Sequence, residues 1–303
     1  MACEFYGRGK LLLSGEYLVL DGAEALALGL QVGQRMRVED VPGDGLEWES
    51  TEKDGSVWFS ARFAADGTLQ EASDAAVAAR LKSLLAVCRE ENPRFDFSGK
   101  RVCLHAEFDR SWGLGSSSTL IYTLAQWAQV DPFALVRRAW PGSGYDVACA
   151  GIRQGNALLY RLEQGIPRWE EVVFRPPFAH RLYFVYSGAK QDTASAVSVY
   201  RQLPAERRLE AAGQVTRMAR QMLSCRTLGD FELLVEQHER LVGNLLGVEP
   251  VGRRCFADYQ GGVVKSLGAW GGDFLLVTGE CAPEYFQGKG FRIVLPFNTI
   301  ATK

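Results

Sequence analysis

A glycine- and serine-rich run, Ser111 to Thr119, has the residue types of a phosphate-binding loop. Gly113 and Gly115 can adopt backbone conformations that other residues resist, so the backbone can approach a ligand closely. The apolar stretch over 120–128 predicts a helix after the loop, and the free amide groups at a helix start attract negative charge. The serines add hydroxyl groups for phosphate oxygens or a metal ion.

The same run is also typical of an ordinary loop that leads into a capped helix. It matches neither of the two common nucleotide-binding loops. No Lys-Ser or Lys-Thr pair follows the glycines at P-loop spacing, and no G-x-G-x-x-G pattern follows a strand. The loop alone therefore leaves phosphate binding and a purely structural role open.

The composition favours work on small molecules. The chain has 303 residues, of which 47% are hydrophobic and 23% charged, which is enough for about two globular domains. The net charge of -2 and a pI near 6.0 argue against a nucleic-acid partner, and no block of like charge suggests a binding tail.

The seven cysteines predict reduced thiols and a cytoplasmic location. They are odd in number and scattered, with no C-x-x-C pair and no histidine at metal-ligand spacing. Charged residues interrupt the apolar stretch near the N-terminus, so we expect no signal peptide. The longest uncharged run, 113–130, is too polar for a membrane span, so we expect no membrane partner.

Strands and helices must hold this loop in place, and the hydrophobic pattern predicts several of them. We expect helices over 73–89, 205–225 and 230–246, and strands over 101–108, 157–160 and 182–186. The first 38 residues favour strands, including 10–13 and 17–20, with a hairpin signal at Asp21-Gly22. The proline-containing stretch 164–181 is the predicted domain boundary.

Five segments, taken in order, resemble the motifs of one family. They are the runs 9–22 (GKLLLSGEYLVLDG), 113–119 (GLGSSST), 142–148 (GSGYDVA), 188–197 (GAKQDTASAV) and 265–277 (KSLGAWGGDFLLV). Together they are similar to the GHMP kinases, the superfamily named for galactokinase, homoserine kinase, mevalonate kinase and phosphomevalonate kinase. The 142–148 and 188–197 segments look most like the mevalonate and phosphomevalonate kinase branch.

The resemblance spans nearly the whole chain and implies an α+β fold of two domains. Residues 1–170 would form an N-terminal catalytic domain like ribosomal protein S5 domain 2. Residues 171–303 would form a ferredoxin-like C-terminal domain, with ATP in the cleft between the two. The implied ligands are ATP, Mg²⁺ and a small-molecule acceptor, and a homodimer is a candidate assembly.

Phosphoryl transfer needs a group that accepts the proton of the attacking hydroxyl and groups that neutralise the phosphoryl charge. Asp146 matches the aspartate of the family's G-S-G-x-D segment, which implies the proton acceptor. Lys10 matches the lysine of the first motif, which implies a cation that keeps Asp146 ionised and stabilises the developing charge. Without the family, a helix-capping Asp146 and a solvated Lys10 are the alternatives.

The family also implies the roles of the loop residues. Gly113, Leu114 and Gly115 would offer backbone amides to the nucleotide, and Ser116, Ser117 and Ser118 would offer hydroxyls. Ser117 is the predicted ligand of Mg²⁺. The glutamate that mevalonate kinases place on the connecting helix has no counterpart here, since 130–140 contains Asp131 as its only acid.

The remaining matched positions are predicted to contact the acceptor. Lys190 would suit an acceptor that already carries a phosphate group. Glu16 would orient the acceptor or Lys10, although a buried structural carboxylate is the alternative. Trp270 stands where a glycine is common and would either narrow the cleft or stack on a ligand, or pack between the two predicted domains. The other predicted acceptor contacts are Ser143, Gly144, Tyr145, Thr193, Gly271 and Gly272.

The sequence therefore predicts an ATP-dependent kinase that acts on mevalonate or 5-phosphomevalonate. A diphosphomevalonate decarboxylase is an alternative, but that branch usually has Ala-Ser-Ser where this chain has Gly115-Ser-Ser. A kinase of another hydroxyl metabolite is also open, because fold and motifs fix the ATP chemistry better than the acceptor. A ligand sensor without turnover is the alternative outside enzymes, against which both Lys10 and Asp146 count.

Overall fold

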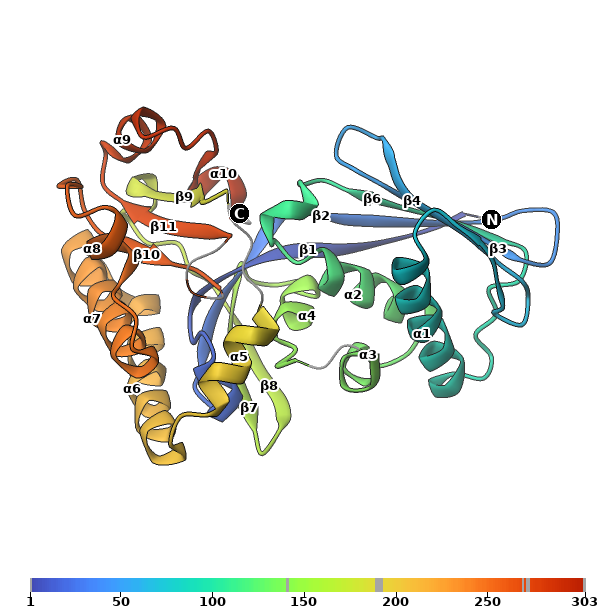
Figure 1. The fold of residues 1–303 in the computed structure, drawn as a ribbon, viewed down its shortest axis with the longest axis horizontal. Coiled ribbons are helices and arrows are strands. Elements are labelled where there is room, and N and C mark those ends of the chain that lie inside the picture. Colours follow the sequence, from blue (N-terminus) through green and yellow to red (C-terminus); the bar gives the residue numbers. More distant parts are fainter. Residues whose placement is uncertain (1, 140–141, 189–192, 269, 271–272, 302–303) are drawn as a thin grey trace. The chain divides into compact units, whose positions relative to one another are not determined.

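The computed structural model describes residues 2–139, 142–188, 193–268, 270 and 273–301 (Figure 1). The chain divides into two compact units, neither of which is continuous in sequence. Unit 1 consists of Met1–Gly9, Val32–Arg110 and Leu114–Gly151, and unit 2 of Lys10–Gln31, Ser111–Gly113 and Ile152–Lys303. The predicted division into residues 1–170 and 171–303 stays a prediction.

Two long strands pass from one unit into the other. β1 (Ala2–Ser14) begins in unit 1 and ends in unit 2. β2 (Ala25–Asp40) begins in unit 2 and ends in unit 1. Lys10 and Glu16 therefore belong to unit 2, although the strand that leads to them starts in unit 1.

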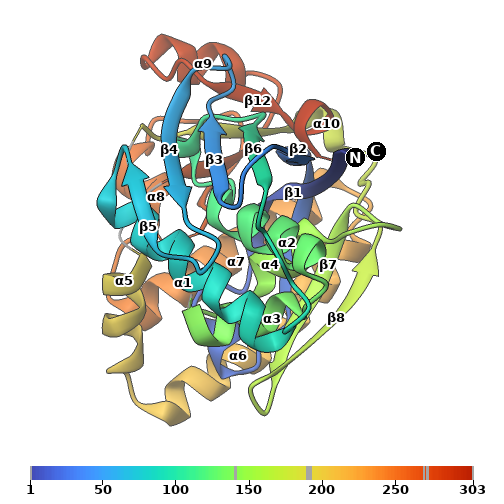
Figure 2. The same ribbon diagram turned by 90° about the vertical axis from the view of Figure 1, so that its right-hand side faces the viewer.

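Unit 1 is a sheet with helices on one face, as Figures 1 and 2 show. Its strands lie in the order β5-β4-β3-β6-β2, with β3 and β6 parallel and the other pairs antiparallel. Besides β2, these strands are β3 (Leu46–Thr51), β4 (Val57–Phe63), β5 (Leu69–Ala72) and β6 (Lys100–Ala106).

The helices of unit 1 bury an apolar face against that sheet. α1 and α2 share one hydrophobic core with the strands, in which Trp48, Phe59, Leu85 and Leu124 are fully buried. The Asp74 side chain caps α1 by accepting from two first-turn amides. The helices are α1 (Ala75–Glu91), η2 (Arg110–Trp112), α2 (Ser116–Ala128), α3 (Pro132–Ala139) and α4 (Tyr145–Ala150).

Unit 2 contains a second, antiparallel sheet of the ferredoxin-like kind. Its described strands lie in the order β10-β11-β9-β12, and helices intervene between β9 and β10 and between β11 and β12. This is the βαββαβ arrangement. The strands are β9 (Leu182–Tyr186), β10 (Val264–Ser266), β11 (Phe274–Thr278) and β12 (Val294–Pro296).

The helices of unit 2 include two long ones, α6 and α7. In α7, which confirms the predicted helix over 230–246, one face is buried and includes Phe231, Val235, His238, Val242 and Leu245. The Thr227 hydroxyl caps this helix. The helices are η3 (Ala179–Arg181), α5 (Thr193–Arg201), α6 (Ala205–Ser224), α7 (Leu228–Leu246), α8 (Val251–Cys255), α9 (Ala282–Gly288) and α10 (Phe297–Ile300).

A hairpin, β7 (Ala157–Glu163) and β8 (Ile166–Val172), continues the sheet of β3 to β6 on the other side of β2. β7 pairs with the first residues of β2, and β8 pairs with β7. Gln164 and Gly165 form the two-residue turn, and both have positive φ (53° and 79°), as a type I′ turn requires. The stretch 164–181, which the sequence predicts to be a domain boundary, contains the turn and β8, whereas β7 comes before it.

One predicted strand is wrong. Residues 17–20 do not extend β1 but enter the 3₁₀ helix η1 (Leu18–Asp21). Gly15 at φ 97° and Tyr17 at φ 58° turn the backbone out of the extended conformation before an apolar run that reads locally as a strand.

The described helices include none that is both long and apolar enough to cross a lipid bilayer.

Candidate functional site

The glycine- and serine-rich loop leads into α2, as the sequence predicts. Gly115 has the left-handed conformation (φ 100°) immediately before the helix. The first helical bond in this region runs from the Thr119 amide to the Gly115 carbonyl oxygen (2.9 Å). The amides of Ser116, Ser117 and Ser118 therefore precede the hydrogen-bonded turns, which is the arrangement that favours an anion.

The three serines have different surroundings. Ser118 is buried, and its hydroxyl donates to the Gly115 carbonyl oxygen (2.8 Å), so it braces the turn. Ser116 and Ser117 are half-buried. Leu114 is fully buried and anchors the loop by packing. Thr119 also bonds to Gln34 on β2 (2.6 Å), which fixes the first turn of α2 to the sheet of unit 1.

Asp146 lies in the first turn of α4, in the same unit as loop residues 114–119. Gly144, with φ 81°, precedes the helix, and the Val147 amide donates to the Asp146 carboxylate (3.0 Å). The Asp146, Ser143 and Tyr145 side chains are half-buried. α4 packs against α2, where a side chain at Gly151 would lie 2.8 Å from the Tyr122 ring. Unit 1 thus carries the candidate proton acceptor and the phosphate-loop candidates from Leu114 to Ser118, whereas Gly113 belongs to unit 2.

Lys10 lies in unit 2, at the start of the same loop. Its ammonium group donates to the Gly113 carbonyl oxygen (2.8 Å), two residues before Gly115. Gly113 has positive φ (68°), and a Cβ there would lie 2.2 Å from Oδ2 of Asp273, just before β11. Only glycine fits at this position, because both the conformation and the close carboxylate exclude a side chain. The first and last of the five segments, 9–22 and 265–277, thus meet the loop at Gly113.

Glu16 belongs to a buried ionic cluster with His238, Glu239 and Lys265, which we call the Lys265 cluster. All four side chains are at most 4% exposed. The Lys265 ammonium lies 2.5 Å from a Glu16 oxygen, 2.9 Å from the Ser266 carbonyl oxygen and 3.5 Å from Glu239. His238 Nε2 lies 3.2 Å from the other Glu16 oxygen.

Burial sets the protonation of this cluster. It raises the pKa of Glu16, which the pairing with Lys265 opposes. Burial, with Lys265 close by, lowers the pKa of His238 well below its usual value, so the ring is neutral at pH 7. Burial raises the pKa of Glu239 to about 7. The sequence pointed to Glu16 but missed its partners, although a lysine inside the apolar run VVKSL was a visible sign of a paired buried charge.

The other predicted acceptor contacts are less well described. Trp270 packs on the core of unit 2 around Val242, and a Cβ at Gly243 would lie 3.1 Å from its ring. Thr193 is the first residue of α5. Lys190, Gly271 and Gly272 lie outside the described residues.

The residues present fit ATP with Mg²⁺ held mainly by the nucleotide. The free first-turn amides of α2 offer donors to phosphate oxygens, and Ser117 offers one oxygen ligand. The described residues include no cluster of three or more His, Cys, Asp or Glu side chains that would form a metal site made by protein alone. Mg²⁺ commonly binds through one or two protein oxygens plus substrate phosphates, which this arrangement allows.

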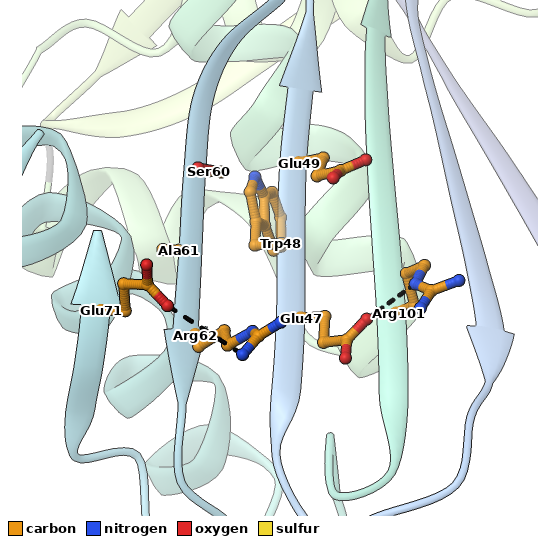
Figure 3. A pocket seen from close by; sticks show the side chains of 8 residues that line it. All are labelled: Glu47, Trp48, Glu49, Ser60, Ala61, Arg62, Glu71 and Arg101. Carbon is orange, nitrogen blue, oxygen red and sulfur yellow. Dashed lines mark hydrogen bonds and ion pairs between the residues drawn. The ribbon is translucent and has the colours of Figure 1, made fainter. Parts of the chain in front are cut away.

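A hollow of about 190 Å³ lies on the sheet of unit 1, away from these residues (Figure 3). Glu47 pairs with Arg101 (2.7 Å) and Glu71 with Arg62 (4.0 Å) along its lining. Both arginines of the lining are thus paired with acids, and the hollow contains no residue that the sequence predicts to be functional.

No protein-family model and no curated protein matches the chain. Solved structures do match it over nearly its full length. L. major mevalonate kinase in complex with R-mevalonate is 17% identical, with 99% of this chain and 96% of that chain covered and a TM-score of 0.66. Lactococcus lactis galactokinase complexed with galactose is 12% identical, with coverage of 99% and 93% and a TM-score of 0.72.

Streptococcus pneumoniae phosphomevalonate kinase, in complex with phosphomevalonate and AMPPNP, is 15% identical, with 95% of each chain covered and a TM-score of 0.66. These structures share the fold of this chain and confirm the predicted α+β class. The chain therefore has the fold of the GHMP kinases over nearly its whole length.

Proposed function

We propose that this protein is an ATP-dependent phosphotransferase that transfers the γ-phosphate to a small hydroxyl-containing acceptor. The observation that carries the proposal is the full-length GHMP kinase fold, in which the glycine- and serine-rich loop opens α2. A kinase needs positioning and charge neutralisation more than covalent chemistry, and the chain has groups suited to both.

Asp146 accepts the proton of the acceptor hydroxyl as its oxygen attacks the γ-phosphorus in line, and ADP leaves. The amides and hydroxyls of Ser116 and Ser117 bind phosphate oxygens. Lys10 supplies a positive charge at the start of the loop, where its bond to Gly113 holds the ammonium group (2.8 Å). Ser117 would hold Mg²⁺, which neutralises phosphate charge when bound.

For the acceptor we propose mevalonate or 5-phosphomevalonate. The support is the resemblance of 142–148 and 188–197 to that branch, together with the matches to mevalonate and phosphomevalonate kinases. A sugar is the second candidate, because the galactokinase match has a TM-score of 0.72. We also propose that the protein is a soluble cytoplasmic enzyme, because its odd number of scattered cysteines indicates reduced thiols.

The test is ADP release from the purified protein with Mg-ATP, measured in parallel on mevalonate, 5-phosphomevalonate, 5-diphosphomevalonate and galactose. We expect turnover on one of the first two. Asp146→Asn should lower kcat by about 10²- to 10⁴-fold, the usual contribution of general-base catalysis. Lys82→Met, which removes an exposed lysine on α1, is the control for loss of charge.

Turnover on galactose alone would replace the proposed acceptor and keep the reaction. Turnover on none of the four, with measurable ATP binding, would favour a sensor over a kinase. Full activity of Asp146→Asn would remove the proton-acceptor role.

A further inference from the structure

The outer edge of β8 is exposed and carries apolar side chains. In the described part of the chain, β8 is the last strand of its sheet. Ile166 is 52% exposed, Trp169 46% and the adjacent Val173 56%. Soluble proteins usually protect such an edge with charge alone or cover it, because an open edge can pair with another strand.

The side chains of β8 have a pattern that is complementary to itself. Ile166, Arg168, Glu170 and Val172 alternate along the strand and share one face. If a second β8 pairs antiparallel, with the two Trp169 residues opposite each other, each Arg168 faces Glu170 of the second copy. Each Ile166 then faces Val172 of that copy.

Only this register gives the complementarity. A shift of the two-fold centre to Arg168 places the two arginines opposite each other, and a shift to Glu170 does the same to the two glutamates. Like charges directly opposite destabilise a strand pair, whereas opposite charges stabilise it. The pattern therefore specifies one register of self-pairing.

The backbone is compatible with this pairing. The type I′ turn closes on the Glu163 and Ile166 pair, so the even-numbered residues of β8 direct their backbone groups toward β7. The odd-numbered residues direct theirs to the outer edge. Pro167 is thus at an outward position and faces Glu171 of the second copy. It has no amide hydrogen to donate, so the pair lacks one ladder hydrogen bond at each Pro167, which weakens the dimer but leaves the bonds between the two Trp169 residues.

We propose that β8 is a homodimer interface, in which two copies of this chain join their sheets across a two-fold axis at Trp169. The occupant is a second copy because the charge and apolar patterns match the strand itself. An edge-to-edge contact of seven residues is smaller than the roughly 1,200–2,000 Å² of a stable interface, so the dimer is reversible and depends on concentration. The proposal does not depend on the proposed activity.

Sedimentation equilibrium tests the proposed dimer. The protein concentration is raised to about 100 μM, a range in which weak complexes form. We expect the mass of the wild-type protein to rise with concentration from 33.5 kDa toward twice that value. Arg168→Glu and Glu170→Arg should each weaken the dimer by about tenfold or more, because two opposite-charge pairs become like-charge pairs.

The double variant Arg168→Glu/Glu170→Arg should dimerise as the wild type does, since the exchange restores both pairs. Arg62→Glu is the matched control, because it reverses the charge of an exposed arginine on a different strand, β4, and leaves β7 and β8 unchanged. A wild-type monomer at every concentration would overturn the proposal. A dimer that neither single variant weakens, or that the double variant fails to restore, would overturn it as well, and unchanged thermal melting of each variant excludes misfolding.

Discussion

The Lys265 side chain has no access to water, so its positive charge is stabilised by the acidic side chains around it. Because Glu16 is equally buried, removal of the Lys265 charge leaves the Glu16 carboxylate without its cation in a low-dielectric interior. We expect Lys265→Met to lower the free energy of unfolding by about 3–5 kcal/mol. Lys289→Met, which removes an exposed ion pair to Asp258, should cost less than about 1 kcal/mol.

The double variant Glu16→Gln/Lys265→Met should be less destabilised than the sum of its two single variants, because it removes both members of the closest pair. Glu239 remains, and burial, which raises its pKa, lets it bind a proton instead of staying charged. Urea unfolding of the four proteins measures this coupling. Additive losses would mean that the two side chains do not stabilise each other.

Glu239 makes the stability depend on pH near neutrality. Its folded pKa of about 7 lies above the ordinary value of 4.5, so between these values the folded chain holds a proton that the unfolded chain has lost. Stability therefore falls as pH rises through this window, by on the order of 3 kcal/mol, and then levels off. His238 acts in the opposite direction below pH 6.5, because its folded pKa is lowered.

Glu239→Gln removes the titration of this carboxyl and leaves that of His238. We expect the variant to gain stability relative to the wild type as pH rises from 5 to 8, measured as the difference between two urea-unfolding series. A difference that does not change with pH would show that Glu239 is ionised throughout.

At the scale of elements, the turn after β1 depends on Gly15. A Cβ at this position would lie 2.6 Å from Ala25. The substituted residue would also have to keep the backbone angle φ of 97°. Gly165 in the β7–β8 turn has a similar φ of 79° but open space around it. We expect Gly15→Ala to cost about 3 kcal/mol or more and Gly165→Ala about 1 kcal/mol, because only the first adds a clash to the backbone strain. Equal melting temperatures would contradict this.

The sequence predicted the elements with a long, regular pattern. Helices α1, α6 and α7 and strands β6, β7 and β9 lie where periodicity placed them, within a few residues. The strand over 17–20 failed because two positive-φ residues override a local apolar run. Strands β3 to β5 were not predicted, since their alternation of apolar and charged residues is short and weak.

The candidate site was predictable only in part, for a similar reason. A motif identifies residues such as Glu16 and Lys10 that lie near others in the same segment. It does not show that His238 and Glu239, more than 200 residues further on, enclose Glu16. Such contacts arise from the packing of α7 on β10, which no local pattern contains.

At the scale of the whole molecule, the proposed ATP site predicts stabilisation by ligand. At about 100 times the dissociation constant, Mg-ATP should stabilise the folded state by about 2.7 kcal/mol and raise the melting temperature by several degrees. Asp146→Asn should keep this shift and lose turnover, since it acts on the acceptor. Thermal melting with and without Mg-ATP, with Mg-GTP as the comparison, measures it, and no shift for the wild type would contradict ATP binding.

The interleaved course of the chain has a consequence for how the protein is made. Every segment of unit 1 has left the ribosome's peptidyl centre by residue 151, whereas unit 2 needs residues 10–31 together with the segment from 152 onward. The apolar residues 25–28 must therefore wait for β7 while translation continues. At a synthesis rate of about 5–20 residues per second, this delay lasts on the order of ten seconds, during which the nascent chain exposes a strand that chaperones would recognise.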